Sequence, residues 1–585
     1  MEVDATRRPQ VRGNDGAGPG RFDPRKMWHV DPPTPAEYEY RKRAIRFWLI
    51  VLILALIVGA IIYWRFVPEM PVDHVAIGDH FKYGSIGSEA GKGVPYRIWK
   101  VLPEMFPEYL PSGVKGVKGS YASLGFIYEL DPATGLRRDT PIGFSKRRMQ
   151  GIEFVGLNCA VCHTATYRGS ATEPPEKATV QVGMPAHQLD LLAYFKFLFD
   201  CAGDGRFTVD NVLGAMDAQE KLSTIERVIY TIAVPRVRQE TLRLAALAQF
   251  MIDHPSGAGR IDTFTPYKTM NFGYRNMAGS SVGNADFPSI WNQRIREGMS
   301  LHWDGNNPSL FERNISAAIG AGATPVSLDL PRMQRIADWL LDFPAPPYPD
   351  TWKINAPLVK RGEELYRQQR CAECHGLKEE QFKNHQVGQV EPIESIKTDR
   401  ERLDSYTIDL TYNQYTLGAG RDWKFRNFRK TGGYANQPLD GLWARAPYLH
   451  NGSVPTLRDL LNPACNPREL EQVGYPARPQ EWEAWDGAAR DRWFCQTRDR
   501  LTDDDVKKIV EKSRALGRRP PVFFRGYDVY DQDRAGFVAD IGSEAGRSFT
   551  KFDVNVRGNG NGGHDWGLGL PAADKDALVE YMKTL

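Results

Sequence analysis

Two short cysteine–histidine motifs constrain this chain more than any other feature. Each reads C-x-x-C-H, the pattern in which two thiols bond to haem vinyl groups and the adjacent histidine ligates the iron. A thioredoxin-like thiol pair would not need the histidine twice, and a zinc site would need ligands from two distant segments. The sequence therefore predicts two covalently bound haem c groups, held by Cys159, Cys162 and His163 and by Cys371, Cys374 and His375.

The composition excludes several classes of protein. The chain has 585 residues, which is more than one compact core holds. Because 75 Lys and Arg nearly balance 72 Asp and Glu, the net positive charge is too small to attract a polyanion, and we expect no nucleic acid partner. Seven cysteines exclude a disulfide-stapled scaffold, and 25% charged residues exclude a polytopic membrane protein.

One apolar segment predicts a single membrane span. Residues 47–64 contain no charge and are long enough, as a helix, to cross the hydrocarbon core. Arg41, Lys42, Arg43 and Arg46 precede it, which by the positive-inside rule puts a disordered tail, residues 1–40, in the bacterial cytoplasm. We therefore expect an inner-membrane anchor at residues 41–66 and a periplasmic remainder. A cleaved signal peptide is the alternative, and it gives the same compartment.

Three cysteines lie outside the two motifs. Because we expect an exported location, Cys465 and Cys495 are predicted to form a structural disulfide. Cys201 would then be an unpaired, buried thiol.

Helical patterns surround the second motif. Residues 356–370 have helical spacing and lead directly into its cysteines, and the chain closes with an amphipathic segment at 574–585. A matching segment at 333–343 ends before a proline-rich linker. The predicted fold class is mainly α: two tandem cytochrome c-like domains with long loop insertions, residues 67–345 and 350–585, preceded by the transmembrane helix.

Several segments together resemble one family. They are the two haem motifs, L-H-W-D-G-N at residues 301–306, A-P-Y-L-H-N-G-S at 446–453, and the closing helix. The chain is similar in these to the di-haem superfamily of bacterial cytochrome c peroxidases, the methylamine dehydrogenase maturation enzyme and the rubber oxygenases. The stretches 257–264 and 558–567 look most similar to the rubber-oxygenase-like branch. In this superfamily the N-terminal haem meets peroxide or O₂, while the C-terminal haem stores and relays electrons.

The resemblance assigns candidate catalytic roles after the first motif. Trp303 matches the tryptophan that couples the two haems. Arg313 and Ala323 stand where peroxidases carry a peroxide-orienting Gln and an acid–base Glu. A general acid is worth roughly 10²–10⁴-fold in rate, so conventional peroxidase activity is in doubt. Glu312 is the nearest carboxylate, but helical neighbours point about 100° apart.

The resemblance also bears on the second haem and on a metal ion. His564 is similar to the distal histidine of the rubber-oxygenase branch, and paired imidazoles imply a low reduction potential. A solvated loop histidine is the alternative. His450 is expected to be a hydrogen-bonding group between the haems rather than a ligand. Asp286, with the carbonyls of Arg445 and Pro447, matches the family's inter-domain calcium site.

Three functions remain open. The first is an oxidoreductase that binds O₂ or peroxide at the His163 haem and receives electrons from a redox partner protein or a quinone-linked donor. The second is a non-catalytic electron carrier with both irons six-coordinate, and the third is an oxidant of another protein. His187, His254 and His302 are single histidines without a ligand motif, which favours an open first haem and the enzyme.

Overall fold

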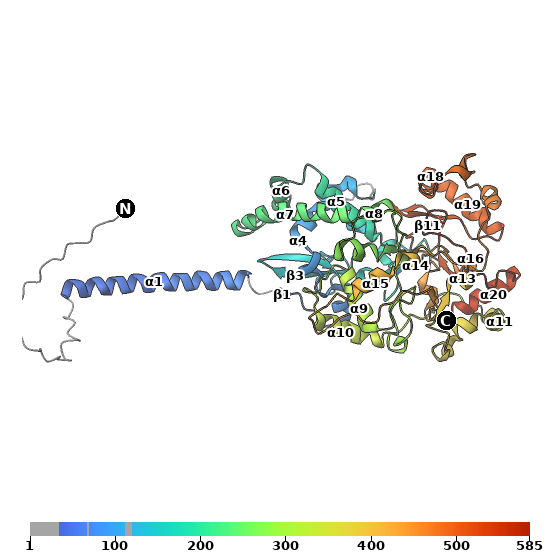
Figure 1. Ribbon diagram of the computed structural model, residues 1–585, viewed down its shortest axis with the longest axis horizontal. Coiled ribbons are helices and arrows are strands. Elements are labelled where there is room, and N and C mark those ends of the chain that lie inside the picture. Colours follow the sequence, from blue (N-terminus) through green and yellow to red (C-terminus); the bar gives the residue numbers. More distant parts are fainter. Residues whose placement is uncertain (1–33, 67–69, 112–119) are drawn as a thin grey trace, which may run out of the picture. The chain divides into compact units, whose positions relative to one another are not determined.

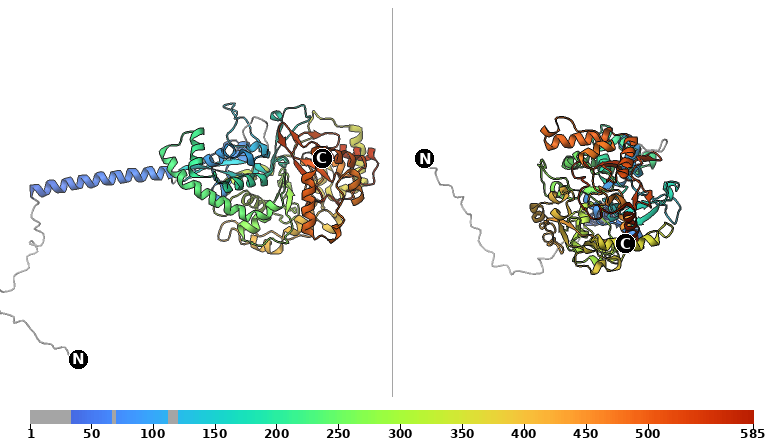
Figure 2. Two further views of the ribbon diagram at one scale, coloured as in Figure 1. Left: turned by 90° about the horizontal axis from the view of Figure 1, so that it is seen from above. Right: turned by 90° about the vertical axis from the view of Figure 1, so that its right-hand side faces the viewer.

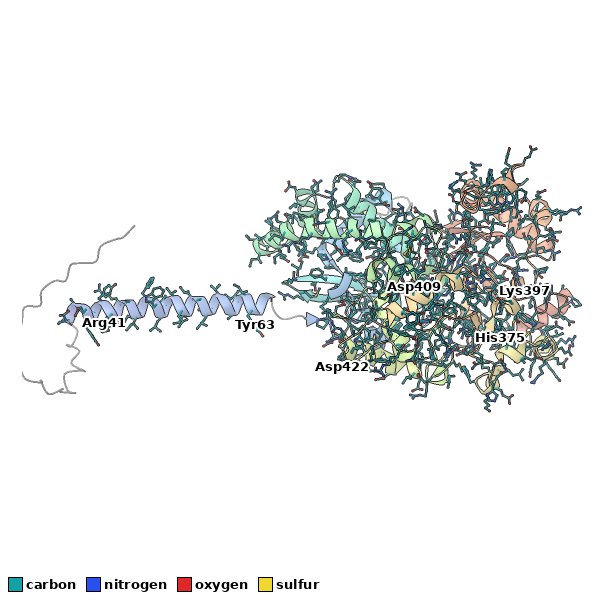
Figure 3. The ribbon with its side chains drawn as sticks, viewed as in Figure 1. Arg41, Tyr63, His375, Lys397, Asp409 and Asp422 are labelled. Atoms are coloured by element: carbon teal, nitrogen blue, oxygen red, sulfur yellow. The ribbon has the colours of Figure 1, made fainter. Side chains whose placement is uncertain are left out.

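The computed structural model describes residues 34–66, 70–111 and 120–585, in two compact units, residues 1–67 and 68–585. The first unit contains helix α1 (Pro35–Phe66), flanked along its apolar stretch by Arg41 and Tyr63 (Figures 1 and 3). Residues 35–40, predicted as tail, are helical, while tail residues 1–33 lie outside the described residues. By length and composition, the stretch Pro35–Tyr63 can cross a membrane, as an anchor or as a signal sequence.

The second unit is predominantly helical, with short strands between the helices. Its first half contains α2 (Ile77–Tyr83), α3 (Ser88–Lys92), α4 (Tyr96–Met105), α5 (Leu191–Gly203), α6 (Val209–Gln219), α7 (Thr224–Leu247), α8 (Gln249–Asp253), α9 (Leu310–Gly320) and α10 (Leu330–Leu341). Its second half contains α11 (Ala356–Gln368), α12 (Cys371–His375), α13 (Ile393–Ile396), α14 (Glu401–Ser405), α15 (Ile408–Gln414), α16 (Leu457–Leu460), α17 (Pro467–Val473), α18 (Gly487–Arg500), α19 (Asp503–Ala515) and α20 (Ala572–Met582).

An antiparallel four-stranded sheet supports the first haem motif. Its order is β1 (Met70–Pro71), β3 (Phe144–Met149), β4 (Ile152–Leu157) and β2 (Val94–Pro95). Strand β4 ends one residue before Asn158, which caps the short 3₁₀ turn Cys159–Val161 by accepting from the Ala160 N–H. The first motif is therefore entered from a strand, whereas the second is entered from helix α11. Helix α2 packs on this turn, and its Phe81 ring lies 5.4 Å from Trp339 of α10.

The helices predicted around the second motif are confirmed as α10, α11 and α20, with ends that differ from the prediction by at most three residues. Helices α11 and α20 cross closely, because a Cβ on Gly362 would lie 2.0 Å from the Ala577 carbonyl oxygen. Tyr366 and Tyr581 pack beside this crossing with ring centres 5.1 Å apart. Glycine at 362 thus permits the crossing that holds the second motif against the C-terminal helix.

Residues 68–585 form one compact unit, and the predicted division into two tandem domains within it stays a prediction. One buried core joins both halves of the chain, packing Met184 and Trp291 with Leu365 and Trp443. An isolated parallel bridge between Arg168 and Val529 also joins the halves. The remaining two-stranded pairings include β7 (Arg260–Asp262) with β8 (Asn284–Asp286) in the first half, and β9 (Val390–Pro392) with β10 (Gly433–Ala435) and β11 (Val522–Arg525) with β16 (Thr550–Asp553) in the second. Figures 1 and 2 show β1, β3, α4, α6 and α7 at one end of this unit and α11, α19 and α20 at the other.

Candidate haem-binding sites and the path between them

Both motif histidines are oriented by a backbone carbonyl. The Nδ1 atom of His163 lies 2.8 Å from the Pro288 carbonyl oxygen, and that of His375 lies 3.0 Å from the Gln437 carbonyl oxygen. A carbonyl only accepts, so each Nδ1 carries the proton and each Nε2 keeps a lone pair for a metal. Burial lowers the pKa of His163 to about 4 and also lowers that of His375, which keeps both rings neutral. These residues fit a c-type haem.

His564 faces His375. The two ring centres are 6.3 Å apart and the rings are inclined by 38°. With metal–imidazole bonds of about 2 Å on each side, an interposed metal separates two ring centres by about 6 Å. The pKa of His564 is lowered to about 3 by burial and by the neighbouring His375, so its ring is also neutral. Its Nδ1 is buried and has no hydrogen-bond partner among the residues that the structure describes. The pair fits two axial ligands of one haem (His375 is labelled in Figure 3).

The loop that carries His564 is built from backbone contacts. The His564 N–H donates to the Ile396 carbonyl at 2.8 Å. At Gly563 the φ angle is +76°, and a Cβ there would lie 2.3 Å from the carbonyl carbon of Lys397, so only glycine fits. The buried Arg519 guanidinium donates to the Gly563 carbonyl at 2.9 Å. The sequence analysis missed Arg519, because a partner so far along the chain from His564 has no local signal.

Trp303 lies on a hydrogen-bonded path between the two motif histidines. Its Nε1 donates to the Asp286 carbonyl at 2.9 Å, two residues before the Pro288 carbonyl that orients His163. On its other side, Gln437 Nε2 donates to the carbonyl of the preceding residue, His302, at 3.1 Å, and the Gln437 carbonyl orients His375. Four hydrogen bonds and two short stretches of backbone therefore connect the two rings.

Residues around Trp303 hold it in place. It packs against Ile393, Leu403 and Tyr434, and its carbonyl accepts from the Ala435 N–H at 2.8 Å. His450 stacks on Tyr434 with ring centres 4.1 Å apart, and its Nε2 lies 3.1 Å from the Tyr434 hydroxyl. His450 is therefore a hydrogen-bonding group on Tyr434, which packs against Trp303, and its place between the haems stays a prediction.

Arg313 and Glu312 have different surroundings. Electrostatically, the Arg313 guanidinium contributes to the low pKa of His163, and burial lowers its own pKa to about 10. Glu312 is buried, and its carboxylate accepts from the Arg426 N–H at 2.8 Å, the Asn427 N–H at 3.1 Å and the side chains of Asn427 and Asn307. With both oxygens engaged, Glu312 ties α9 to a neighbouring loop and does not fit a proton donor.

The predicted calcium site does not fit the ion. The Asp286 carboxylate is buried and accepts from Arg525 Nη2 at 2.8 Å, while a second buried guanidinium, Arg260, also stabilises its charge. Burial still raises the pKa of Asp286 to about 6. The two guanidinium groups already neutralise the negative charge of this carboxylate, so it cannot attract a divalent cation. Within residues 34–66, 70–111 and 120–585, no group of three or more acidic, Cys or His side chains could hold a metal ion.

The predicted Cys465–Cys495 disulfide is wrong, because both cysteines are free. Cys465 Sγ lies 3.7 Å from the Arg519 carbonyl, whereas Cys495 on α18 lines a separate cavity. The two thiols therefore belong to different surroundings. Cys201 is buried and free, as predicted.

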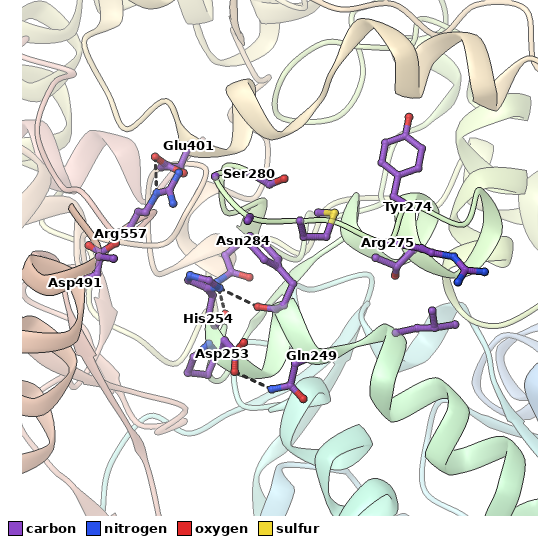
Figure 4. Close-up of a pocket in the computed structure, with 18 of the residues that line it drawn as sticks. Gln249, Asp253, His254, Tyr274, Arg275, Ser280, Asn284, Glu401, Asp491 and Arg557 are labelled. Carbon is purple, nitrogen blue, oxygen red and sulfur yellow. Dashed lines mark hydrogen bonds and ion pairs between the residues drawn. The ribbon is translucent and has the colours of Figure 1, made fainter. Parts of the chain in front are cut away.

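The cavity beside Cys495 is large and contains none of the predicted haem ligands. Its volume is about 1940 Å³, and its walls come from α7, α8, residues 269–280 and α18 (Figure 4). His254 lies in its wall with Nδ1 2.9 Å from the Phe250 carbonyl, so this histidine is already satisfied. Glu401 pairs with Arg557 at 2.9 Å across another part of the wall.

Comparison with known proteins gives one domain match. The family described as "RoxA-like, cytochrome c-like" matches residues 433–470, which include strand β10 and the A-P-Y-L-H-N-G-S segment. This supports the rubber-oxygenase and cytochrome c resemblance at a coarse level, and a cytochrome c-like domain implies covalently bound haem c and an extracytoplasmic location.

Two curated proteins of Sinorhizobium fredii (strain NBRC 101917 / NGR234) are also similar. The uncharacterized protein y4iM is 32% identical over 211 residues, covering 32% of this chain and 46% of that protein. The uncharacterized protein y4iJ is 30% identical over 161 residues, covering 26% of this chain and 18% of that protein. The chain thus spans less than half the length of either relative.

Proposed function

We propose that this chain is a membrane-anchored, periplasmic di-haem c-type cytochrome that acts as an oxidoreductase, with O₂ or peroxide bound at the N-terminal haem and electrons relayed by the C-terminal haem. The observation that carries this proposal is the path through Trp303. A continuous hydrogen-bonded connection from His163 to His375 suits a protein whose two redox centres exchange electrons, whereas two independent centres would not need it.

The different surroundings of the two histidines support different tasks. His375 faces a second imidazole, that of His564, which suits an electron-storing centre with two axial ligands. In the part of the chain that the structure describes, no ring contact pairs His163 with another histidine. The helix beside it, α9, contributes buried Ile315, Ala318 and Ile319 to the core that also contains Ala160. An apolar wall with one cation, Arg313, suits a small ligand such as O₂ or peroxide.

The protein's own groups orient the centres and control access to them. Haem supplies the one-electron and oxygen chemistry when bound. The Pro288 and Gln437 carbonyls fix the tautomer and rotation of the two histidines. The Glu312 carboxylate is already engaged by hydrogen-bond donors, and the position where peroxidases carry an acid–base Glu is the buried Ala323. Neither residue can donate a proton to peroxide, which favours an oxygenase-like reaction over conventional peroxide cleavage.

Ferric electron paramagnetic resonance tests the proposal on the full-length chain, matured in a bacterium that attaches haem c. We expect one high-spin and one low-spin signal, with the high-spin haem responding to O₂ after reduction or to peroxide. His564→Ala should convert the low-spin signal to high spin. His385→Ala, which removes an exposed histidine, should change neither signal.

The same spectra can contradict the proposal. Two low-spin signals that neither oxidant alters would identify a non-catalytic electron carrier. A low-spin signal that survives His564→Ala would show that the sixth ligand of the second haem is a different residue.

A further inference from the structure

We propose that the unit of residues 68–585 docks onto the bilayer surface through the exposed apolar face of helix α7. This interaction is additional to the covalent anchor, and it rests on the membrane attachment in the proposed function. The docking would hold the haem-binding unit in one orientation relative to the membrane.

Helix α7 has an apolar stripe that no other part of the described chain covers. Ile225, Val228 and Ile232 are spaced three and four residues apart, so they lie on one face, and each is more than half exposed. The opposite face is buried through Tyr230 and Val234. Ser223 and Glu226 form a capping box, which fixes the first turn of the helix.

The stripe lies near the point where the anchor joins this unit. Helix α1 ends at Phe66 and β1 begins at Met70, and the intervening chain can span at most about 14 Å. Strand β1 belongs to the sheet β1-β3-β4-β2, about 14 Å across at 4.8 Å per strand. Helix α4 follows β2, and its Arg97 pairs with Glu226 in the first turn of α7 at 4.0 Å. Figures 1 and 2 show α7 and β1 at the same end of the unit.

A second apolar projection lies just after β1. Val75 is 94% exposed, although its backbone is fixed, because the Arg335 guanidinium donates to the carbonyls of His74 and Val75. An aliphatic side chain held rigidly in solvent five residues after Met70 has no stabilising role in the folded unit. In a headgroup layer it would be buried.

Two further loops present apolar side chains beside the same strands. Leu130 and Leu136 are exposed on a turn whose Glu129 accepts from Tyr83, and the Tyr83 ring lies 6.1 Å from that of His74. Val326 is 80% exposed, three residues before Asp329. Asp329 pairs with Arg147, the β3 partner of Pro71, at 2.8 Å. Exposed aliphatic side chains therefore surround β1 on more than one side.

The charges on α7 favour a lipid surface. On α7, Arg236 is exposed beside the stripe, while the exposed Arg227 and Arg243 pair with Asp217 and Glu240. An apolar face bordered by arginines is typical of a helix lying in the plane of an anionic bilayer. A second copy of the chain is a poorer occupant, because the next two positions of the stripe are Pro235 and Gln239, which interrupt a helix–helix seam.

The test uses full-length, haem-loaded protein with a protease site inserted between Phe66 and Met70. The protein is reconstituted into vesicles of phosphatidylethanolamine and phosphatidylglycerol, cleaved, and sedimented. We expect the cleaved wild-type unit to stay with the vesicles. The combined Ile225→Ser, Val228→Ser and Ile232→Ser variant should bind at least about tenfold more weakly. The matched control replaces Ile408 and Tyr412, two exposed apolar residues of α15, and should bind like the wild type.

Several outcomes would overturn the inference. They are complete release of the cleaved wild type, equal binding of the α7 variant, and dimers in solution that the α7 variant abolishes. Unchanged haem absorbance and elution volume would verify that the variants fold. The uncleaved chain tests the anchor separately: if it fails to sediment with vesicles, the anchoring in the proposed function fails, whereas docking is still judged by adding the cleaved unit to vesicles.

Discussion

Arg525 and Asp286 form a buried ion pair beside the Trp303 path, and breaking it should destabilise the protein strongly. Arg525 donates to the Asp286 carboxylate at 2.8 Å and to the carbonyls of Asn451 and Gly452 at 3.2 and 3.1 Å. Its side chain is 1% exposed and that of Asp286 is 8% exposed. Replacing Arg525 by methionine keeps most of the volume but leaves the carboxylate and two carbonyls without this donor.

The expected cost follows from that geometry. Removing one partner of a buried ion pair costs about 3–5 kcal/mol, because the remaining charge is uncompensated. We expect Arg525→Met to fall at the lower end of this range, because Arg260 still stabilises the Asp286 charge. Asp286→Asn should cost less, because the asparagine oxygen still accepts from Arg525. The double variant should be more stable than the sum of the single effects predicts, by about 1–3 kcal/mol.

Denaturant unfolding of the haem-loaded protein, followed by circular dichroism, measures these differences. Additive single effects would refute a direct interaction between the two side chains. An unchanged unfolding midpoint for Arg525→Met would show that the pair is not buried. The same assay tests the metal assignment, because a loss of wild-type stability on adding a calcium chelator would show that Asp286 binds calcium after all.

Three further predictions follow from single residues. Burial raises the pKa of Asp553 from 3.8 to about 6, so the folded state binds this proton more tightly than the unfolded state, and this group alone should lower the free energy of unfolding by about 3 kcal/mol between pH 4 and 7. Asp553→Asn should remove this dependence in unfolding curves across that range; parallel curves for both proteins would contradict it. Glu312→Gln should lower the free energy of unfolding by about 1–3 kcal/mol, because its amide N–H₂ would face donors such as the Asn427 side chain. The folded variant should react with peroxide as the wild type does. A loss of 10²-fold or more would instead make Glu312 a general acid. Mass spectrometry after alkylation without reductant should find both Cys465 and Cys495 labelled, and an unlabelled pair would restore the disulfide.

Local patterns explain what the sequence predicted well. Helix α11 was readable because Asn355 caps it, Pro357 occupies its first turn and apolar residues recur at helical spacing. The haem motifs were equally local, since each places all three residues within five positions. His564 was found through its resemblance to a distal histidine, and the structure places it opposite His375.

Long-range backbone contacts explain what the sequence could not predict. The carbonyls of Pro288 and Gln437 orient the motif histidines, yet a carbonyl acceptor has no side-chain signature. The pairing of Asp286 with Arg525 joins residues 239 positions apart, so a lone acidic residue could be read as a calcium ligand. Strand β4, which leads into Cys159, was not among the predicted elements.

Electron exchange between the two haems tests the central claim most directly. In the half-reduced, full-length protein, time-resolved absorbance should show rapid exchange that Trp303→Phe slows severalfold without changing either haem spectrum. Trp485→Phe, which alters a half-buried tryptophan in the core of α18 and α19, should exchange like the wild type. Equal exchange in the wild type and Trp303→Phe would contradict the path through Trp303, and with it the proposal that the two centres work as one oxidoreductase.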